Sequence, residues 1–290
     1  MKAIAPGKVI LSGEHAVVYG KPALVTAVNR YIACDIQPTE ETNLHLSFPE
    51  LKSNKTRPME TLADLQRDVD RRYARFLEGT GHVTDLLEAP IDLMAYTAAV
   101  FLNRYGLAPA TGLRITLDSQ LSVGCGMGSS AAAILALLTG LAHHFAVEMD
   151  RETAFALAMK GESIQHGKPS GVDPWVCLHG GCIRFQHGEA VPNRLPPWSG
   201  LLIQTGQPAS TTGECVMQVA DRFHNNPIWN AFETTTESLQ SAMIQGQDPR
   251  DTIRTNHRLL CDIGVTPIFI KCAHNMPLET LQHWHGTELA

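Results

Sequence analysis

The chain has 290 residues, of which 44% are hydrophobic and 18% are charged, and its formal net charge is −6. This composition is typical of a globular protein with one or two cores, and it excludes disorder and a basic surface for nucleic acid. Seven scattered cysteines without a Cys-x-x-Cys pair argue against a disulfide framework and favour a reducing cytosol. The most apolar run, residues 131–142, is far shorter than the roughly 20 residues of a membrane span, so we expect no membrane association.

The first fifty residues show the alternation of apolar and polar side chains that predicts β-structure. A strand is expected to begin at Ile4, and residues 16–19 and 31–36 are expected to form two more. The polar stretch at residues 53–61 is expected to be a connection into the first helix.

Apolar residues recur at helical spacing through much of the remaining chain. Helices are predicted at residues 60–77, 90–105, 129–145, 150–166, 212–224, 228–245 and 249–263. Strands are predicted at residues 113–117, at 182–185 and from Leu201, and residues 192–197 are expected to be a linker. The pattern predicts two domains, residues 1–186 and 187–290.

Residues 124–130 read Gly-Cys-Gly-Met-Gly-Ser-Ser and join a predicted strand to a helix that is apolar on every side. Three glycines at alternate positions permit dihedral angles closed to other residues and let a ligand approach the backbone. The unbonded N–H groups of the following helix favour an anion, and the hydroxyls of Ser129 and Ser130 can reach a phosphate or its Mg²⁺. No lysine follows the last glycine, so this is not the common P-loop. A tight turn capped by Ser129 is the structural alternative.

Two carboxylates follow on the next helices. Glu162 lies on or beside an apolar helix face, where a buried carboxylate needs a partner. Either Mg²⁺ held together with a phosphate or a salt bridge to a basic side chain would provide one. Asp173 precedes Pro174, so it suits the cap of a helix that begins at Pro174. It equally suits a base that accepts the proton of an attacking hydroxyl.

A third segment lies near the N-terminus. Lys8 follows a glycine, and Glu14 and His15 come soon after it. This combination suits gripping a carboxylate or a hydroxyl. The alternative is a surface lysine and a hairpin stabilised by Glu14 and His15.

Together the three segments resemble the GHMP kinases, the group that includes the galactokinases, homoserine kinases and mevalonate kinases. Within the group, Pro6-Gly7-Lys8-Val9-Ile10-Leu11 running into Gly13-Glu14-His15-Ala16-Val17-Val18-Tyr19-Gly20 resembles the mevalonate kinases. The resemblance covers about residues 1–267. It implies an α+β, two-domain GHMP kinase fold, with a mixed α/β N-terminal domain and a ferredoxin-like C-terminal domain.

The resemblance also implies an activity, namely ATP-dependent phosphorylation of mevalonate to 5-phosphomevalonate in cytosolic isoprenoid precursor synthesis, with a homodimer as the candidate assembly. Asp173 would be the general base, and Lys8 would contact the substrate and stabilise charge on the transferring phosphoryl group. Mevalonate would be bound by Lys8, Glu14, His15 and Thr212, with Thr211 as the neighbouring alternative to Thr212. The ATP phosphates would be wrapped by Gly124, Gly126, Met127, Gly128, Ser129 and Ser130. Mg²⁺ would be held by Glu162 with Ser129 or Ser130.

Two departures from the family pattern stand out. Ser122 occupies the place where the family's phosphate loop usually opens with a proline, and we expect a small effect. No glycine-rich third motif follows Pro267, and the tail from Met276 to Ala290 is polar and rich in histidine. We therefore expect a chain truncated or altered near residue 267, with the C-terminal sheet short of strands and turnover weakened or lost.

Other functions remain open from the sequence. The chain could be a non-catalytic remnant that still binds nucleotide or mevalonate. It could also be a GHMP kinase for another small alcohol, although a phosphorylated substrate would call for additional Arg or Lys side chains. An interaction module without enzymatic activity would explain none of the three segments.

Overall fold

The computed structural model describes residues 2–121, 124–196, 200–202, 212–265 and 287–289. Its contacts divide the chain into two compact units. The first comprises Met1–Gly7 and Arg30–Gly180, and the second comprises Lys8–Asn29 and Gly181–Ala290. Strand β1 (Ala3–Ser12) and strand β2 (Ala23–Thr39) each contribute residues to both units. This division is discontinuous along the chain, whereas the domains expected from the sequence are continuous, and the boundary after residue 186 stays a prediction.

The first unit contains a sheet built on the later half of β2. This half pairs antiparallel with β5 (Gly112–Ser119), from Ile32 opposite Ser119 to Thr39 opposite Gly112. Strand β5 pairs parallel with β3 (Asn43–Phe48), which pairs antiparallel with β4 (Ser53–Pro58). The stretch at 53–61, expected to be a connection, is therefore largely an edge strand, because every residue of β4 has a partner on β3. Short 3-10 turns stand at Pro49–Leu51, Met59–Thr61 and Val83–Asp85.

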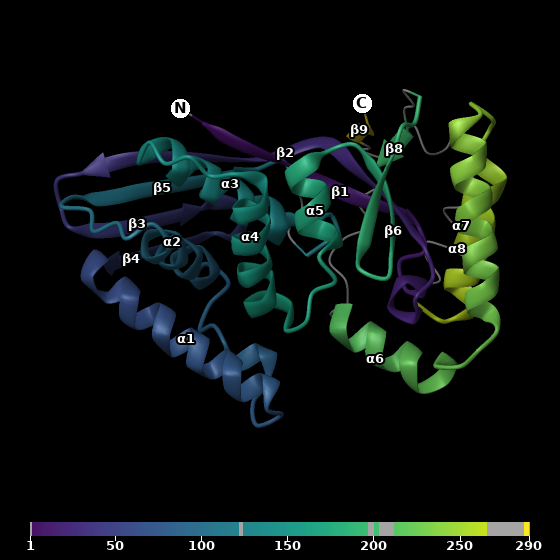
Figure 1. Cartoon of the computed structure of the whole chain (residues 1–290), viewed down its shortest axis with the longest axis horizontal. Helices are drawn as coiled ribbons and strands as arrows, with labels where there is room; N and C mark the ends of the chain where they lie inside the picture. Colours follow the sequence, from purple (N-terminus) through teal and green to yellow (C-terminus); the bar gives the residue numbers. More distant parts are fainter. Residues whose placement is uncertain (1, 122–123, 197–199, 203–211, 266–286, 290) are drawn as a thin grey trace. The chain divides into compact units, whose positions relative to one another are not determined.

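Five helices complete the first unit (Figure 1). They are α1 (Leu62–Leu77), α2 (Asp92–Arg104), α3 (Ser129–His144), α4 (Arg151–His166) and α5 (Val172–His179). Helices α2 and α3 are buried on nearly all sides, as expected of helices without a polar face. Helix α3 packs against α2, α4 and α5, so three neighbouring helices hold it in place.

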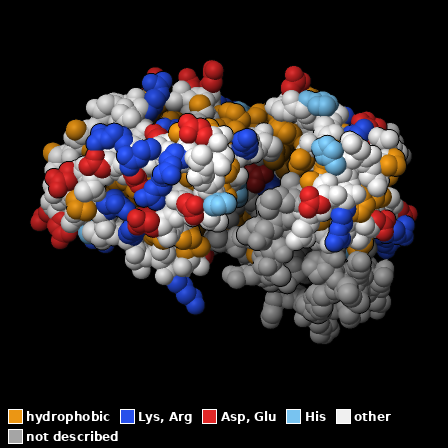
Figure 2. Space-filling model, turned by 90° about the horizontal axis from the view of Figure 1, so that it is seen from below, with side chains coloured by type: hydrophobic (Ala, Val, Ile, Leu, Met, Phe, Trp, Pro, Cys, Tyr) orange, Lys and Arg blue, Asp and Glu red, His pale blue; other side chains and the backbone are white. Residues whose placement is uncertain are grey.

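Helix α1 covers the outside of this unit with charged side chains. Its arginines pair with acids one turn away, Arg67 with Asp64 and both Arg71 and Arg72 with Asp68. Figure 2 shows blue and red side chains interleaved on the face that includes this helix. Arg67, Arg71 and Arg72 are thus paired on the helix itself.

The second unit begins with the early half of β2, which pairs antiparallel with β6 (Cys182–Gln186). Strand β6 forms a hairpin with β7 (Glu189–Asn193), whose turn places both His187 and Gly188 at positive φ. Such a turn suits the twist of a two-residue hairpin. Strand β8 (Gly200–Leu202) pairs with β9 (Thr287–Leu289), and three helices follow the hairpin in sequence: α6 (Thr212–Phe223), α7 (Ile228–Ile244) and α8 (Arg250–Asp262).

The helices predicted from the sequence are confirmed to within two residues at each end, but the strand predicted at residues 16–19 is wrong. Residues 16–19 form a 3-10 helix, η1 (Ala16–Tyr19), because Gly13 and Gly20 turn the chain at positive φ on either side. The linker expected at residues 192–197 starts two residues later than predicted, because β7 extends to Asn193 opposite β6, whereas residues 194–196 have no regular structure. The strand predicted at residues 31–36 lies within the longer β2, since β5 pairs with β2 as far as Thr39.

Within the described residues, no helix is long and apolar enough to cross a membrane. The predicted alteration after Pro267 falls on residues 266–286, which lie outside the described part of the chain.

Candidate active site

The glycine-rich loop at residues 124–130 adopts the backbone that its sequence predicts. Gly124, Gly126 and Gly128 have φ angles of 79°, 74° and 68°, a region that L side chains rarely enter. A Cβ atom on Gly124 or Gly126 would meet no heavy atom within 4 Å, so the backbone angle and not space requires glycine there. Gly128 is the residue before α3, which corrects the alternative that Ser129 caps the helix. The loop thus leads into the start of α3 and leaves open space beside Gly124 and Gly126.

Strand β1 packs against this loop at Gly7. A Cβ atom on Gly7 would lie 2.5 Å from Leu121 Cδ2 and 3.0 Å from the carbonyl oxygen of Met127. A larger residue at position 7 would therefore have to push the Leu121 side chain aside and would press on the backbone of the loop. Met127 itself is buried, with 8% of its surface exposed, and Gly128 is buried beside it, whereas Gly124 and Gly126 are exposed.

Glu162 and Ser130 are brought together at the start of α3, through a residue that sequence reasoning missed. Glu162 is 2% exposed on α4, and His166 lies one turn further along the same helix. His166 Nε2 is 3.6 Å from Glu162 Oε2 and 3.3 Å from Ser130 Oγ. A carboxylate, an imidazole and a hydroxyl therefore meet beside the positive end of the α3 dipole. The i, i+4 spacing of Glu162 and His166 was the available signal.

Asp173 lies on the short helix α5, which packs against α3 and α4. The helix begins at Val172 with Gly171 (φ 88°) as its N-cap, so the prediction that Asp173 caps a helix starting at Pro174 is wrong. A glycine can take the left-handed cap conformation that an aspartate takes less readily. Asp173 stands in the first turn instead, where a negative charge is favourable. Cys177 Sγ, one turn later, approaches the carbonyl oxygen of Gly128 at 3.9 Å and ties α5 to the glycine-rich loop.

In the second unit, Lys8 and Glu14 occupy a polar core rather than the surface. Lys8 is 5% exposed, which rules out the surface-lysine alternative. Asn256 Nδ2 on α8 donates to Glu14 Oε2 at 3.3 Å, and Ser12 Oγ donates to Asn256 Oδ1 at 2.9 Å. Since the single proton of Ser12 is used in this way, Thr236 on α7 donates to Ser12 over 2.7 Å. Ser12, Thr236 and Asn256 were not predicted from the sequence, because their partners lie more than 200 residues away.

This surrounding changes the acidity of both predicted substrate residues. Burial raises the pKa of Glu14 above its ordinary value, and its own backbone N–H, Asn256 and the charge of Lys8 oppose the rise without cancelling it. Burial lowers the pKa of His15, which favours the neutral imidazole. Gly13 fixes the path of the chain immediately before Glu14 and His15, because a Cβ there would stand 2.3 Å from the carbonyl oxygen of Pro22. Thr212 is the first residue of α6, and its side chain lies outside the described part of the structure.

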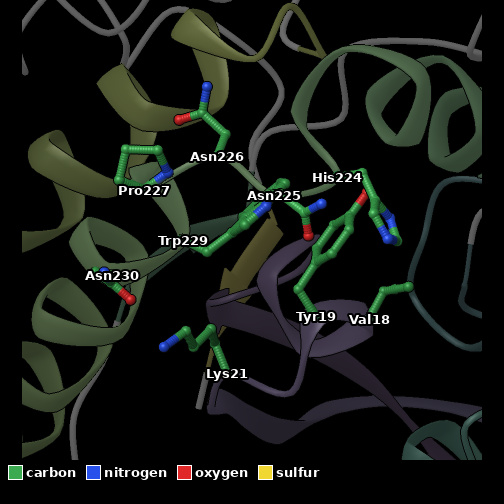
Figure 3. Close-up of a pocket in the computed structure, with 9 residues that line it drawn as sticks. All are labelled: Val18, Tyr19, Lys21, His224, Asn225, Asn226, Pro227, Trp229 and Asn230. Carbon is green, nitrogen blue, oxygen red and sulfur yellow. The ribbon is translucent and has the colours of Figure 1, made fainter.

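An aromatic stack anchors the segment that carries Glu14 and His15 (Figure 3). Tyr19 stacks on Trp229 with ring centroids 4.1 Å apart, and His224 meets the Tyr19 ring edge-on at 6.1 Å. These rings border a pocket of about 570 Å³ between η1 and the connection from α6 to α7, with Lys21 on its rim. Lys21 Nζ is 2.6 Å from Glu233, so its charge is already matched and does not single the pocket out for a phosphate.

Comparison with known proteins gives matches to one family over most of the chain. The family model described as GHMP kinases N terminal domain matches residues 92–181. The mevalonate kinase of Archaeoglobus fulgidus is 30% identical over 274 residues, covering 92% of this chain and 81% of the relative. That of Arabidopsis thaliana is 29% identical over 331 residues, covering 98% and 85%.

Solved structures show the same fold. The mevalonate kinase of Methanococcus jannaschii superposes with a TM-score of 0.79 at 20% identity, covering 92% of this chain and 80% of that one. The L. major mevalonate kinase in complex with R-mevalonate gives a TM-score of 0.65 at 23% identity, covering 91% and 76%.

Proposed function

The chain belongs to the mevalonate kinases of the GHMP kinase family, and from this premise we propose that it transfers the γ-phosphoryl group of ATP to mevalonate. The products are 5-phosphomevalonate and ADP, at a step of isoprenoid precursor synthesis in the cytoplasm. The observation that carries the proposal is the glycine-rich loop. Three left-handed glycines lead into α3, and Ser130 and the buried Glu162 lie together at that helix start.

In this proposal the loop holds the phosphates of ATP. The first N–H groups of α3 have no partner within the helix, so they donate to phosphate oxygens. Because Gly124 and Gly126 carry no side chain and have open space around their Cα atoms, the phosphates can approach the backbone closely. The helix dipole favours the negative charge of the polyphosphate.

The residues present also fit a magnesium ion. Glu162, which is 2% exposed, and a serine hydroxyl supply oxygen, the ligand atom that Mg²⁺ prefers. No cluster of three His, Cys, Asp or Glu side chains occurs among the described residues. A phosphate-bound Mg²⁺ needs only one or two protein ligands, since phosphates and waters complete its shell. A magnesium ion held there would supply positive charge that offsets the negative charge developing on the transferring phosphoryl group.

The remaining roles belong to the acceptor. Asp173 accepts the proton of the mevalonate hydroxyl as its oxygen forms a bond to the γ-phosphorus and the bond to the ADP oxygen breaks. Lys8 supplies positive charge to the transferring group. Glu14 and His15 bind mevalonate, with His15 as a neutral donor or acceptor because its pKa is lowered. Thr212, at the start of α6, completes the set of residues proposed to bind mevalonate.

A coupled ADP-release assay with mevalonate and Mg²⁺ tests the proposal. Replacing Asp173 by asparagine keeps the shape of the side chain and removes its basicity, so we expect kcat to fall about 10²–10⁴-fold. Glu78→Ala, an exposed acid at the end of α1, is the matched control and should keep wild-type turnover. ADP release that does not depend on mevalonate, or an Asp173→Asn enzyme at full rate, would refute the proposal.

A further inference from the structure

His166 stands where two different helices meet. It follows Glu162 by one turn of α4, so both side chains project from the same face of that helix. Its Nε2 atom is 3.3 Å from Ser130 Oγ, on α3, and 3.6 Å from Glu162 Oε2. A single ring nitrogen therefore contacts one oxygen from each helix, and these are two of the oxygens that fit Mg²⁺.

The backbone at His166 is held firmly from a third helix. Gly167, which ends α4 with a φ of 76°, accepts a hydrogen bond of 2.8 Å from the Tyr73 hydroxyl on α1. A Cβ on residue 167 would stand 2.7 Å from Phe76 Cζ, so this turn tolerates only glycine. The amide of Lys168 donates to the carbonyl oxygen of His166 at 2.9 Å. The backbone that carries the His166 imidazole is thus held in place, although 46% of the His166 side chain is exposed.

The contact from His166 defines the orientation of the Glu162 carboxylate, which burial of Glu162 alone does not do. The terminal torsion of a glutamate is broad, so packing leaves the rotation of its carboxylate loosely defined. A contact from Nε2 to Oε2 sets that rotation and therefore the direction of the second oxygen. The contact to Ser130 ties the same reference point to the first turn of α3. Groups that orient metal ligands in this way commonly matter almost as much as the ligands.

We propose that His166 is a positioning residue, which holds Glu162 and Ser130 in the arrangement that binds the magnesium complex of ATP. This inference rests on the proposed function, and it assigns His166 no contact with the reacting atoms. A purely structural alternative exists, because a histidine at a helix end also interacts with the helix dipole. The two roles differ in what they affect: a structural role changes the stability of the free protein, and a positioning role changes the Mg²⁺ dependence of nucleotide binding.

The test is a thermal-shift titration of the full chain with saturating ATP and increasing Mg²⁺, repeated as a kinetic titration with mevalonate. In His166→Ala we expect the Mg²⁺ concentration at half-maximal stabilisation to rise about 10–100-fold. His166→Gln should restore it close to wild type, because its amide nitrogen reaches the position of Nε2. His166→Asn, equally polar but shorter, should behave like alanine. His143→Ala, an exposed histidine at the far end of α3, is the matched control.

The outcomes separate this inference from the function on which it rests. If wild type shows neither Mg²⁺-dependent stabilisation by ATP nor turnover of mevalonate, the proposed function fails and the inference fails with it. If wild type shows both and His166→Ala keeps the wild-type Mg²⁺ midpoint, the inference alone is overturned. The inference alone is also overturned if His166→Gln and His166→Asn lower the melting temperature of the free protein equally and both keep the wild-type Mg²⁺ midpoint. A glutamine variant that matches wild type beside a defective asparagine variant supports it.

Discussion

Glu14 is a carboxylate whose partners come from distant parts of the chain. Asn256 donates to it, Ser12 and Thr236 continue the same chain of hydrogen bonds, and Ser12, Thr236 and Asn256 are all at most 5% exposed. Such a network is favourable only when each member finds its partner. Burial also has a cost for the ionised form of Glu14. It raises the pKa of Glu14 more than the hydrogen bonds and the charge of Lys8 lower it.

The raised pKa predicts how stability changes with pH. A carboxyl group that binds its proton more tightly in the folded state contributes fully to stability at low pH. This contribution declines as the pH rises from the ordinary value of 4.5 through the higher folded pKa, and it does not change further above it. We therefore expect wild type to lose free energy of unfolding relative to Glu14→Gln across this window.

Urea unfolding at several pH values from 4 upward, without substrate, measures the difference between the two proteins. Glu40→Gln, at an exposed position on another part of the chain, serves as the control and should follow wild type. A Glu14→Gln protein whose stability runs parallel to wild type at every pH would contradict the predicted shift.

At the scale of the element, two glycines can separate the effect of backbone strain on stability from the role of the glycine-rich loop in binding ATP. Gly126 has a φ of 74°, and a Cβ there would meet nothing within 4 Å. Gly246, at the end of α7, shares both properties with a φ of 66°. Alanine at either position should lower the free energy of unfolding by about 1–2 kcal/mol, the cost of a left-handed backbone for an L residue.

Of the two substitutions, only Gly126→Ala should affect the binding of ATP. We expect Gly126→Ala to raise KM for ATP, because its methyl group occupies the space through which phosphate approaches, and Gly246→Ala to leave KM unchanged. Urea unfolding and a titration of ATP in the coupled assay measure the two effects. Equal changes in KM for both variants would show that the loop glycines act only through stability.

The elements differ in how well the sequence predicts them, for physical reasons. Helices α2 and α3 are apolar runs too long for a strand, so their length and composition located them to within two residues. The segment Ala16–Tyr19 has the β-branched residues of a strand, yet it forms a 3-10 helix because Gly13 and Gly20 redirect the backbone and Ala16 packs on Trp229. Tertiary contacts of this kind override local propensity.

The candidate site divides in the same way. Gly124, Gly126 and Gly128 are recognisable because a loop with left-handed angles needs glycine at those places. His166 and Asn256 are not, since a lone histidine or asparagine on a helix has many uses. Their roles depend on which groups face them after folding, which no local pattern records.

At the scale of the whole molecule, residues 8–29 pack with the chain after residue 180. Ala16, Leu24 and Val25 are fully buried there, Ala16 against Trp229 and Phe232 and Leu24 against Cys182 and Leu239. A fragment ending at residue 180 would leave these side chains in water. Exposed apolar surface of this kind promotes aggregation.

We therefore predict that residues 1–180 expressed alone are less soluble than residues 30–180, although the second fragment is shorter and omits β1. Supplying residues 181–290 as a second chain should recover soluble 1–180 and should not change 30–180. Soluble yield and cooperative urea unfolding measure this outcome. A fragment of residues 1–180 that is soluble and unfolds cooperatively by itself would show that residues 8–29 do not need their later partners.

The hydrogen bonds of Ser12 and Glu14 also set an order of events during synthesis. Their partners Thr236 and Asn256 follow them by 224 to 244 residues. At a translation rate of about 5–20 residues per second, that interval lasts roughly 10–50 s. Ser12 and Glu14 are therefore synthesised well before the residues that become their native neighbours. Throughout that interval Ser12 and Glu14 must remain hydrated or be shielded by a chaperone.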